Sequence, residues 1–231
     1  MKYKNIVEGV FVSRPNRFIA NVVVDGVEQI VHVKNTGRCR ELLVEGAKVY
    51  LSVSDNLARK TKYDLVAVEK VTSRGVLLIN MDSQIPNDVV SEWLPKSGMF
   101  SDNAVYRREY TYGKSRFDIY VEDGSRKAFV EVKGVTLEND GIVSFPDAPT
   151  ERGVKHLNEL ITALDYGFEC YVIFVVQMKG VTEFKANRER HPEFADALKK
   201  AFESSVKIKA LDCIVTHDEI KLDTDINVCI I

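Results

Sequence analysis

Three acidic residues and one lysine in this chain could together hold a metal ion and hydrolyse a phosphodiester: Glu109, Asp118, Glu131 and Lys133. Carboxylate oxygens suit Mg²⁺, which takes one or two carboxylates with waters and substrate phosphate, and Mn²⁺ accepts the same donors. The metal ion would polarise the phosphate and lower the pKa of the attacking water. Lys133 shares a strand face with Glu131, and its ammonium would orient that water or stabilise the phosphorane oxygens.

The residues around these acids predict the sheet that would bring them together. Aromatic and β-branched residues fill three short runs between positions 107 and 135, separated by Gly113-Lys114 and Gly124-Ser125. Glycine in the first position is typical of a two-residue type II′ turn, so the pattern predicts a three-stranded meander. With these turns, Glu109 faces Asp118, and Asp118 faces Glu131. Opposed Cβ atoms lie about 4.5 to 5.5 Å apart, so these acids repel one another and need a cation.

An Asp followed by Glu-x-Lys on one sheet face is the set with which a large class of nucleases holds Mg²⁺. The competing interpretation is chance, because Asp, Glu and Lys occur at these spacings in many strands. A register slip of one residue would also turn a whole strand's side chains to the other face. The metal site is therefore a hypothesis that depends on the register of the meander.

A helix is predicted after residue 150, and its first turns carry two candidate phosphate ligands. Thr150 is a suitable N-cap for this helix. Arg152 and His156 are four residues apart, near the free backbone N–H groups of the helix N-terminus, where phosphate binds readily. A solvated helix face is the alternative for this pair. The predicted buried stripe consists of Val154, Leu157, Ile161 and Leu164.

Three sequence blocks, at residues 115–118, 131–137 and 145–157, resemble the sugar fermentation stimulation protein family of bacteria and archaea. The third block begins Phe-Pro-Asp-Ala-Pro-Thr and is long and unusual, and the match extends over nearly the whole chain. The resemblance implies an OB-fold barrel in residues 1–84, followed in residues 85–231 by a PD-(D/E)xK, restriction-endonuclease-like mixed sheet flanked by helices. It also implies DNA binding and a proposed regulatory role in sugar (maltose) metabolism. The usual Pro of the nuclease motif is absent, because Phe117 precedes Asp118.

The composition predicts an ordinary soluble protein. The chain has 231 residues, 45% of them apolar, enough for one large or two small domains. No apolar run approaches the roughly 20 residues that cross a bilayer. No signal-peptide core follows the N-terminus, so we expect a cytoplasmic protein without a membrane partner. The four cysteines are scattered without a Cys-x-x-Cys pair, so we expect reduced thiols rather than a zinc site or disulfides.

Charge is distributed unevenly although the net value is only −2. Residues 1–85 contain 13 Lys and Arg against 9 Asp and Glu, whereas the remainder contains 19 against 25. The excess of positive charge therefore lies in the N-terminal part, where a nucleic-acid contact is expected. Metal-binding carboxylates account for some of the negative charge of the C-terminal part.

The first half has the element order of an OB barrel. Three strands at residues 4–13, 17–24 and 27–33 precede a short helix at 38–44, and further strands follow at 47–53, 63–71 and 75–80. This order is expected of an OB barrel, although other small β-barrels share it. In the second half, a helix is predicted near 89–94 and strands at 170–177 and 207–215, with a helix at 192–204. Strand, helix and strand in succession after the meander predict a parallel crossover.

Cationic residues near the predicted short helix would form a groove that follows a phosphate backbone. Thr36 would cap this helix and Gly37 would permit a positive φ. For Phe11, Phe18 and Tyr50 core packing is expected, with base stacking as the alternative. DNA is the expected partner, with both single-stranded and double-stranded DNA left open, and the predicted contacts are Lys34, Arg38, Arg40, Arg59, Lys60, Lys62, Arg116, Arg152 and His156.

Three functions remain open from the sequence. The first is a Mg²⁺- or Mn²⁺-dependent phosphodiesterase acting on DNA, with Asp118 and Glu131 as ligands, Glu109 as a possible third and Lys133 in catalysis. The second is a transcriptional regulator whose nuclease-like domain only binds DNA. The third is a structural metal site. The full set of acids and lysine favours the enzyme, since a protein that only binds DNA has no need to hold repelling carboxylates together.

Overall fold

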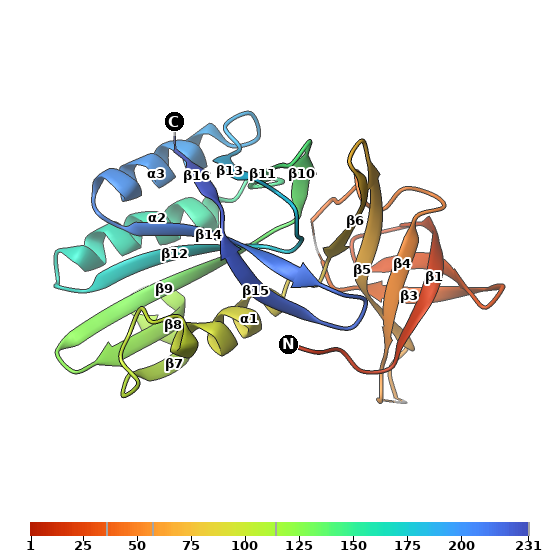
Figure 1. Cartoon of the computed structure of the whole chain (residues 1–231), viewed down its shortest axis with the longest axis horizontal. Coiled ribbons are helices and arrows are strands. Elements are labelled where there is room, and N and C mark those ends of the chain that lie inside the picture. The colour runs from red at the N-terminus through yellow and green to blue at the C-terminus, as the bar shows by residue number, and fades with distance from the viewer. Residues whose placement is uncertain (36, 57, 114, 231) are drawn as a thin grey trace.

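The computed structural model describes residues 1–35, 37–56, 58–113 and 115–230. Thr36, predicted as a helix cap, and Lys114, predicted in the first hairpin turn, lie outside the described residues. A β-barrel built by the N-terminal part stands beside a larger sheet that carries helices on both faces (Figure 1). The predicted barrel followed by a mixed sheet with flanking helices is confirmed. The position of the domain boundary, between residues 84 and 85, stays a prediction.

The barrel consists of antiparallel strands that close through one parallel pairing, between β3 and β5. This arrangement is typical of an OB barrel. The helix predicted at residues 38–44 is absent there, because Cys39 has a positive φ of 44° and hydrogen-bonded turns replace the helix. The strands are β1 (Ile6–Ser13), β2 (Ile19–Val24), β3 (Val27–Val33), β4 (Lys48–Val53), β5 (Tyr63–Thr72) and β6 (Gly75–Asn80).

The second unit contains a mixed sheet in the order β15-β14-β12-β9-β8-β7 and a smaller sheet in the order β10-β11-β13-β16. Strand β12 pairs parallel with both β9 and β14, which confirms the predicted crossover. The strands of the larger sheet are β7 (Val105–Tyr112), β8 (Ser115–Asp123), β9 (Arg126–Val135), β12 (Glu169–Val176), β14 (Lys207–Val215) and β15 (Ile220–Asp225). The smaller sheet has β10 (Leu137–Asn139), β11 (Ile142–Phe145), β13 (Glu183–Ala186) and β16 (Asn227–Cys229).

Helices cover the larger sheet on opposite faces. Helices α2 (Glu151–Leu164) and α3 (Pro192–Glu203) lie on one face, and α1 (Ile85–Trp93), which continues into the short helix η1 (Leu94–Lys96), lies on the other (Figure 1). The predicted cap of α2 is confirmed, since Thr150 Oγ1 accepts a hydrogen bond from the N–H of Gly153 at 3.1 Å. None of the helices in the described parts of the chain has the length and apolar character needed to cross a membrane.

The register predicted for the meander is confirmed. Tyr112 pairs with Ser115 across the first turn, and Asp123 pairs with Arg126 across the second. Gly124 has a φ of 61°, as the first central residue of a type II′ turn requires. The two turns therefore fix the register of β7, β8 and β9, although no ladder pair of the described strands joins Glu109 to Asp118 or Asp118 to Glu131.

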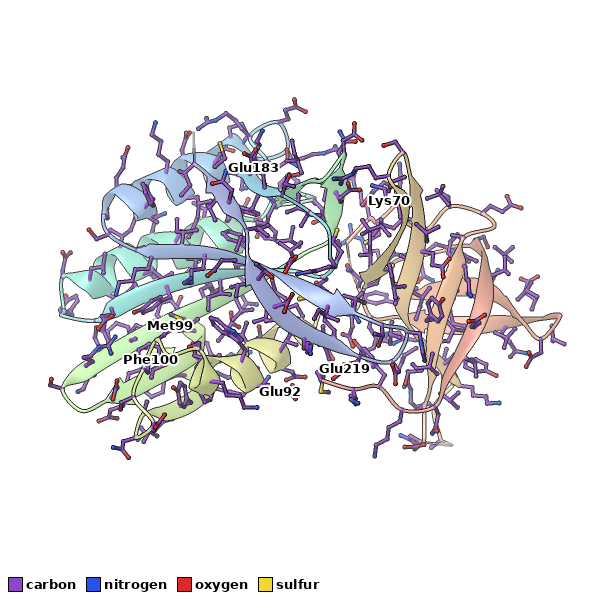
Figure 2. The ribbon with its side chains drawn as sticks, in the orientation of Figure 1. Lys70, Glu92, Met99, Phe100, Glu183 and Glu219 are labelled. Carbon is purple, nitrogen blue, oxygen red and sulfur yellow. The ribbon has the colours of Figure 1, made fainter. Side chains whose placement is uncertain are left out.

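Polar contacts join the barrel to the second unit. Lys70 of β5 lies on the barrel side that faces the second unit, where its Nζ contacts the buried Glu138 carboxylate of β10 at 2.7 Å (Figure 2). The buried Gln177 amide donates to Asn80 Oδ1 and to the carbonyls of Asn80 and Asp82. The acid residues on β8 and β9 are thereby held at a fixed position relative to the barrel.

Candidate active site

Asp118 lies where strands β8 and β9 separate. Their ladder stops one residue short of Asp118 and Glu131. Beyond that point the Asp118 carboxylate takes the place of the neighbouring backbone, and its Oδ2 accepts a hydrogen bond from the N–H of Val132 at 2.8 Å. Its Oδ1 accepts from Asn87 Nδ2, on α1, at 2.9 Å. Two neutral donors therefore fix the carboxylate without neutralising its charge.

Glu131 is buried, with 1% of its surface exposed. Its Oε1 accepts two hydrogen bonds of 2.5 Å each, from Lys133 Nζ and from His156 Nδ1. Its Oε2 is buried without a hydrogen-bond partner among the described residues. Because buried polar atoms are normally hydrogen-bonded, this oxygen marks a position where a ligand would bind.

His156 holds Glu131 in place. Arg152 Nε donates a long hydrogen bond of 3.4 Å to His156 Nε2. Since Nε2 accepts, we assign a ring proton to Nδ1, which donates to Glu131. The prediction that His156 contacts phosphate does not fit this position, because the side chain is 6% exposed and its Nδ1 is already bonded to Glu131.

The phase of α2 explains why the sequence did not reveal this role. The predicted buried stripe contained Val154 and Ile161, yet both are only partly buried. The buried face is rotated towards His156, and its members are Gly153, His156, Leu157, Leu160 and Ala163. In the sequence, His156 lies outside the predicted apolar stripe, so nothing indicates that it is buried. Only the fold shows that it contacts Glu131.

The two acids have pKa values shifted in opposite directions. Burial opposes ionisation of Glu131, but the hydrogen bond from His156 and the charge of Lys133 outweigh it and lower the pKa of Glu131. Burial, and next the negative charge of Glu131, raise the pKa of Asp118. Titratable groups perturbed in this way are typical of functional sites. The surroundings therefore favour the ionised form of Glu131 and oppose the ionised form of Asp118.

Asp118 opens into a polar cleft of about 570 Å³. Three arginines line it, Arg108, Arg116 and Arg152. Arg116 and Arg152 were predicted as nucleic-acid contacts, and the structure brings them to this cleft. Arg108 was not predicted. The remaining lining residues are Ser83, Gln84, Asn87, Asp88, Glu109, Phe117 and Asp118.

Glu109 lies on the rim of the same cleft. Its φ is 52°, and it forms no ladder pair although the residues on either side pair in the predicted register. Its side chain is 61% exposed, and Oε2 lies 3.4 Å from Arg116 Nη1. Among the described residues, no group of three His, Cys, Asp or Glu side chains is arranged to hold a metal ion. The protein donors available to a cation are therefore Asp118 and Glu131, with Glu109 further out.

Asn87 and Asp88 are the site residues that sequence reasoning missed. Both lie on α1, which packs against β9 from the face opposite α2. Asn87 binds Asp118, and Asp88 Oδ1 lies 2.6 Å from Arg108 Nη1. The sequence offered little signal, since the helix was predicted only from about residue 89, whereas α1 begins at Ile85 and includes both residues.

The barrel cations predicted as one groove separate into three groups. Lys34 is bound to the fully buried Asp82 at 2.5 Å, and Arg59 forms a two-pronged pair with Asp64 at 2.6 and 2.8 Å. These two side chains therefore stabilise the barrel rather than stand free for phosphate. Lys60 and Lys62 are exposed elsewhere, with Lys62 Nζ over the Tyr63 ring at 5.1 Å to the centroid. The arginines Arg38 and Arg40 line a separate hollow of about 430 Å³ with Arg14 and Arg17.

The three candidate stacking aromatics also differ. Phe11 and Tyr50 are 3% and 7% exposed, which confirms that they pack in the core. The expectation of core packing is wrong for Phe18, which is 54% exposed and lines a third hollow of about 470 Å³. It stands just before β2, where the chain leaves a turn made by Asn16.

Comparison with known proteins adds a family to this geometry. Residues 12–78 match the sequence model of the SfsA N-terminal OB domain, and residues 84–219 match that of the sugar fermentation stimulation protein RE domain. The chain is 55% identical over 222 residues to a sugar fermentation stimulation protein homolog of Clostridium beijerinckii, covering 96% of each. It is 58% identical over 221 residues to a homolog from Desulfitobacterium hafniense, covering 96% of this chain and 95% of the relative.

A solved structure supports the same relationship. The fold superimposes on that of Pyrococcus furiosus SfsA in complex with Ca²⁺ with a TM-score of 0.85. The match covers 100% of this chain and 98% of the archaeal chain, at 26% sequence identity. Two domain models, close relatives over nearly full length and a common fold agree. The chain belongs to the sugar fermentation stimulation protein family.

Proposed function

We propose that this protein is a metal-dependent phosphodiesterase that acts on DNA through a PD-(D/E)xK-type site. The observation that carries the proposal is the buried Glu131 Oε2, which has no hydrogen-bond partner among the described residues, next to an Asp118 carboxylate of raised pKa. A site that holds two ionisable acids together without neutralising both is suited to a cation. A protein that only binds DNA gains nothing from this repulsion.

The donor set fits Mg²⁺ or Mn²⁺. Hard carboxylate oxygens from Asp118 and Glu131 meet the preference of Mg²⁺ for one or two carboxylates, with waters and substrate phosphate completing the coordination. A cage of three protein ligands is not needed for such binding. The related Pyrococcus furiosus protein was solved in complex with Ca²⁺, another cation that prefers oxygen ligands, and this supports a cation site in the family fold.

Each residue of the site has a chemical role in the proposed reaction. When bound, the metal ion would polarise the phosphate and acidify the attacking water. His156 keeps the Glu131 carboxylate oriented through its Nδ1, as residues behind a metal ligand commonly do. The Lys133 ammonium, next to Glu131 in the interior, is the group that stabilises negative charge on the phosphorane. Arg116 and Arg152 of the cleft would bind the flanking phosphates.

The alternative is a DNA-binding regulator of sugar metabolism without catalysis. The exposed arginines on the barrel, Arg38 and Arg40, favour DNA binding equally under both proposals. The acid pair is what favours the enzyme. The two proposals differ in the effect of a divalent cation: the enzyme would cleave the DNA when the cation is present, whereas in the regulator the cation would change only the affinity of the protein for DNA.

The test incubates the protein with end-labelled single-stranded DNA, duplex DNA and matching RNA, in EDTA, Mg²⁺ or Mn²⁺. Lys133→Ala and Glu131→Gln test the site, and Lys127→Ala on the same strand, at an exposed position, is the matched control. We expect metal-dependent cleavage by the wild type and the control, and none by the two site variants. Absence of cleavage with every metal, together with salt-sensitive binding shared by all variants, would leave a DNA-binding protein and refute the enzyme.

A further inference from the structure

The backbone of Phe18, on the barrel, is fixed by hydrogen bonds, whereas its ring is exposed to solvent. The N–H groups of Phe18 and Ile19 donate to Asn16 Oδ1 at 2.9 and 3.1 Å. The Phe18 carbonyl accepts from the N–H of Val33 at 2.8 Å. The backbone is fixed on both sides and the side chain is 54% exposed. The ring therefore loses little conformational entropy when a planar group stacks on it.

Three exposed arginines line the hollow of about 430 Å³ and have no carboxylate partner among the described residues: Arg17, which directly precedes Phe18 in the chain, Arg38 and Arg40. Most other arginines here are paired, as Arg59 is with Asp64. Three arginines without an acidic partner around one hollow concentrate positive charge there, and such a concentration attracts an anionic partner.

Arg14 fixes the two segments that carry these arginines. Its guanidinium donates four hydrogen bonds to backbone carbonyls, those of Arg17, Asn35, Gly37 and Arg38. Their lengths lie between 2.6 and 2.9 Å. Arg17 and Arg38 come from segments about 20 residues apart, so Arg14 sets the spacing of their side chains. The cationic hollow is therefore preorganised, which suits the regularly spaced phosphates of a polynucleotide.

The surface around Phe18 is continuous with the acid cleft. Phe18 lines a hollow together with His32, Val33, Lys34, Arg59 and Asp64, and its two further lining residues are Ser83 and Gln84. The same two residues line the cleft that contains Asp118. A chain stacked on Phe18 would therefore reach the acid cleft over Ser83 and Gln84, after passing the Lys34–Asp82 and Arg59–Asp64 ion pairs.

We propose that Phe18, Arg17, Arg38 and Arg40, here called the Phe18 platform, bind a single-stranded polynucleotide and direct it over Ser83 and Gln84 to the acid cleft. An aromatic ring can stack only on a base that is not already stacked inside a helix, so an aromatic platform beside unpaired arginines fits a single strand better than a duplex. The direction towards Asp118 rests on the proposed function, whereas binding to the platform does not.

The experiment measures binding of fluorescent oligonucleotides in EDTA, so that cleavage cannot contribute. Single-stranded DNA, single-stranded RNA of the same sequence and duplex DNA are compared by anisotropy. Phe18→Ala removes the ring and Phe18→Trp retains a stacking surface. Phe202→Ala on α3 is the matched control, because Phe202 is 57% exposed but lies on the second unit.

We expect Phe18→Ala to weaken single-strand binding by between about 5-fold and about 150-fold, the effect of losing one base–aromatic stack. Phe18→Trp should bind like the wild type, and duplex affinity should change less than 2-fold. Arg17→Ala and Arg38→Ala should each reduce the salt dependence, with the slope of log K against log salt falling by about 0.7, whereas Arg190→Ala, on the other unit, should not.

Equal single-strand affinity of Phe18→Ala and the wild type would overturn the proposal, even if cleavage is observed. Conversely, a Phe18-dependent affinity without cleavage would refute the phosphodiesterase and leave the platform intact, so the two failures are distinguishable. Comparison of the affinities for single-stranded DNA and RNA shows whether the protein distinguishes deoxyribose from ribose. Light scattering completes the test, because a change from dimer to monomer in Phe18→Ala would show that a second copy of the chain covers the ring instead.

Discussion

Replacement of Lys133 by Met is the sharpest test of how the acid site is held together. Lys133 Nζ lies 2.5 Å from Glu131 Oε1, and the two side chains are 16% and 2% exposed. Methionine keeps most of the packing of the lysine stem, so the change removes chiefly the charge and its hydrogen bonds. Glu131 then retains one donor, His156 Nδ1.

The size of the loss follows from this arrangement. Leaving a buried charge wholly unpaired costs about 3 to 5 kcal/mol, and losing one hydrogen bond to a charged group costs about 1.5 to 3 kcal/mol. Because His156 remains, we expect the lower range, about 2 to 3 kcal/mol in the free energy of unfolding at pH 7. Lys127→Met, at an exposed position of the same strand, should change it by less than about 0.5 kcal/mol.

The loss should depend on pH in a defined direction. The folded-state pKa of Glu131 is lowered, so its interactions stabilise the protein above the unfolded value of about 4.3 and are lost as the pH falls through the folded pKa. The difference between wild type and Lys133→Met should therefore be largest near neutrality and shrink in acid. Urea unfolding in EDTA at pH 7, 5 and 3 measures it. A difference below about 0.5 kcal/mol at pH 7, or one that is equal at all three values, would refute the reasoning.

Three further changes test the fold around the site. Lys70→Met should destabilise the protein by about 3 kcal/mol in chemical unfolding, because Glu138 is 1% exposed and keeps only the more distant Arg74 as a cation; a loss within error would show that Arg74 suffices. Gly134→Ala should cost about 1 to 3 kcal/mol, since the new Cβ would lie 2.5 Å from Gln177 Oε1 and 2.8 Å from Pro86 Cγ, and Gln177→Ala in the same chain should recover part of it. Glu169→Gln should lower thermal stability at pH 7 by about 1 kcal/mol, because hydrogen bonds from Arg126, and then from Lys207, lower the pKa of Glu169. That contribution is present above the unfolded pKa and is lost as Glu169 is protonated in acid, so an equal loss at pH 7 and at pH 2 would contradict it.

The part of the site that the sequence could predict is the part set by local turns. Gly113 and Gly124 fix the hairpins, and the register then brings Asp118 and Glu131 to the residues just beyond the last β8–β9 pair without knowledge of the rest of the fold. Short-range chemistry at Thr150 likewise set the start of α2. The register and the helix cap needed no distant contacts, which is why both were predictable.

Contacts between distant segments decided the rest. Lys34 looks like a free cation in the sequence, but Asp82, 48 positions later, neutralises it inside the junction. Asn87 reaches Asp118 only because α1 packs across the sheet from the face opposite α2. The helix predicted at residues 38–44 failed for a backbone reason, since Cys39 adopts a positive φ and Arg14 binds the neighbouring carbonyls.

Opposite shifts of two neighbouring acids define what the site can bind. Glu131 stays ionised because His156 and Lys133 donate to one of its oxygens, while the other is left without a partner among the described residues. That fixed negative charge is one cause of the raised pKa of Asp118. A divalent cation between the two would remove this repulsion and favour the ionised form of Asp118, so cation binding and proton release are coupled. The hydrogen bonds from Asn87 and Val132 already orient the carboxylate, so the proposed cation would find this ligand in place.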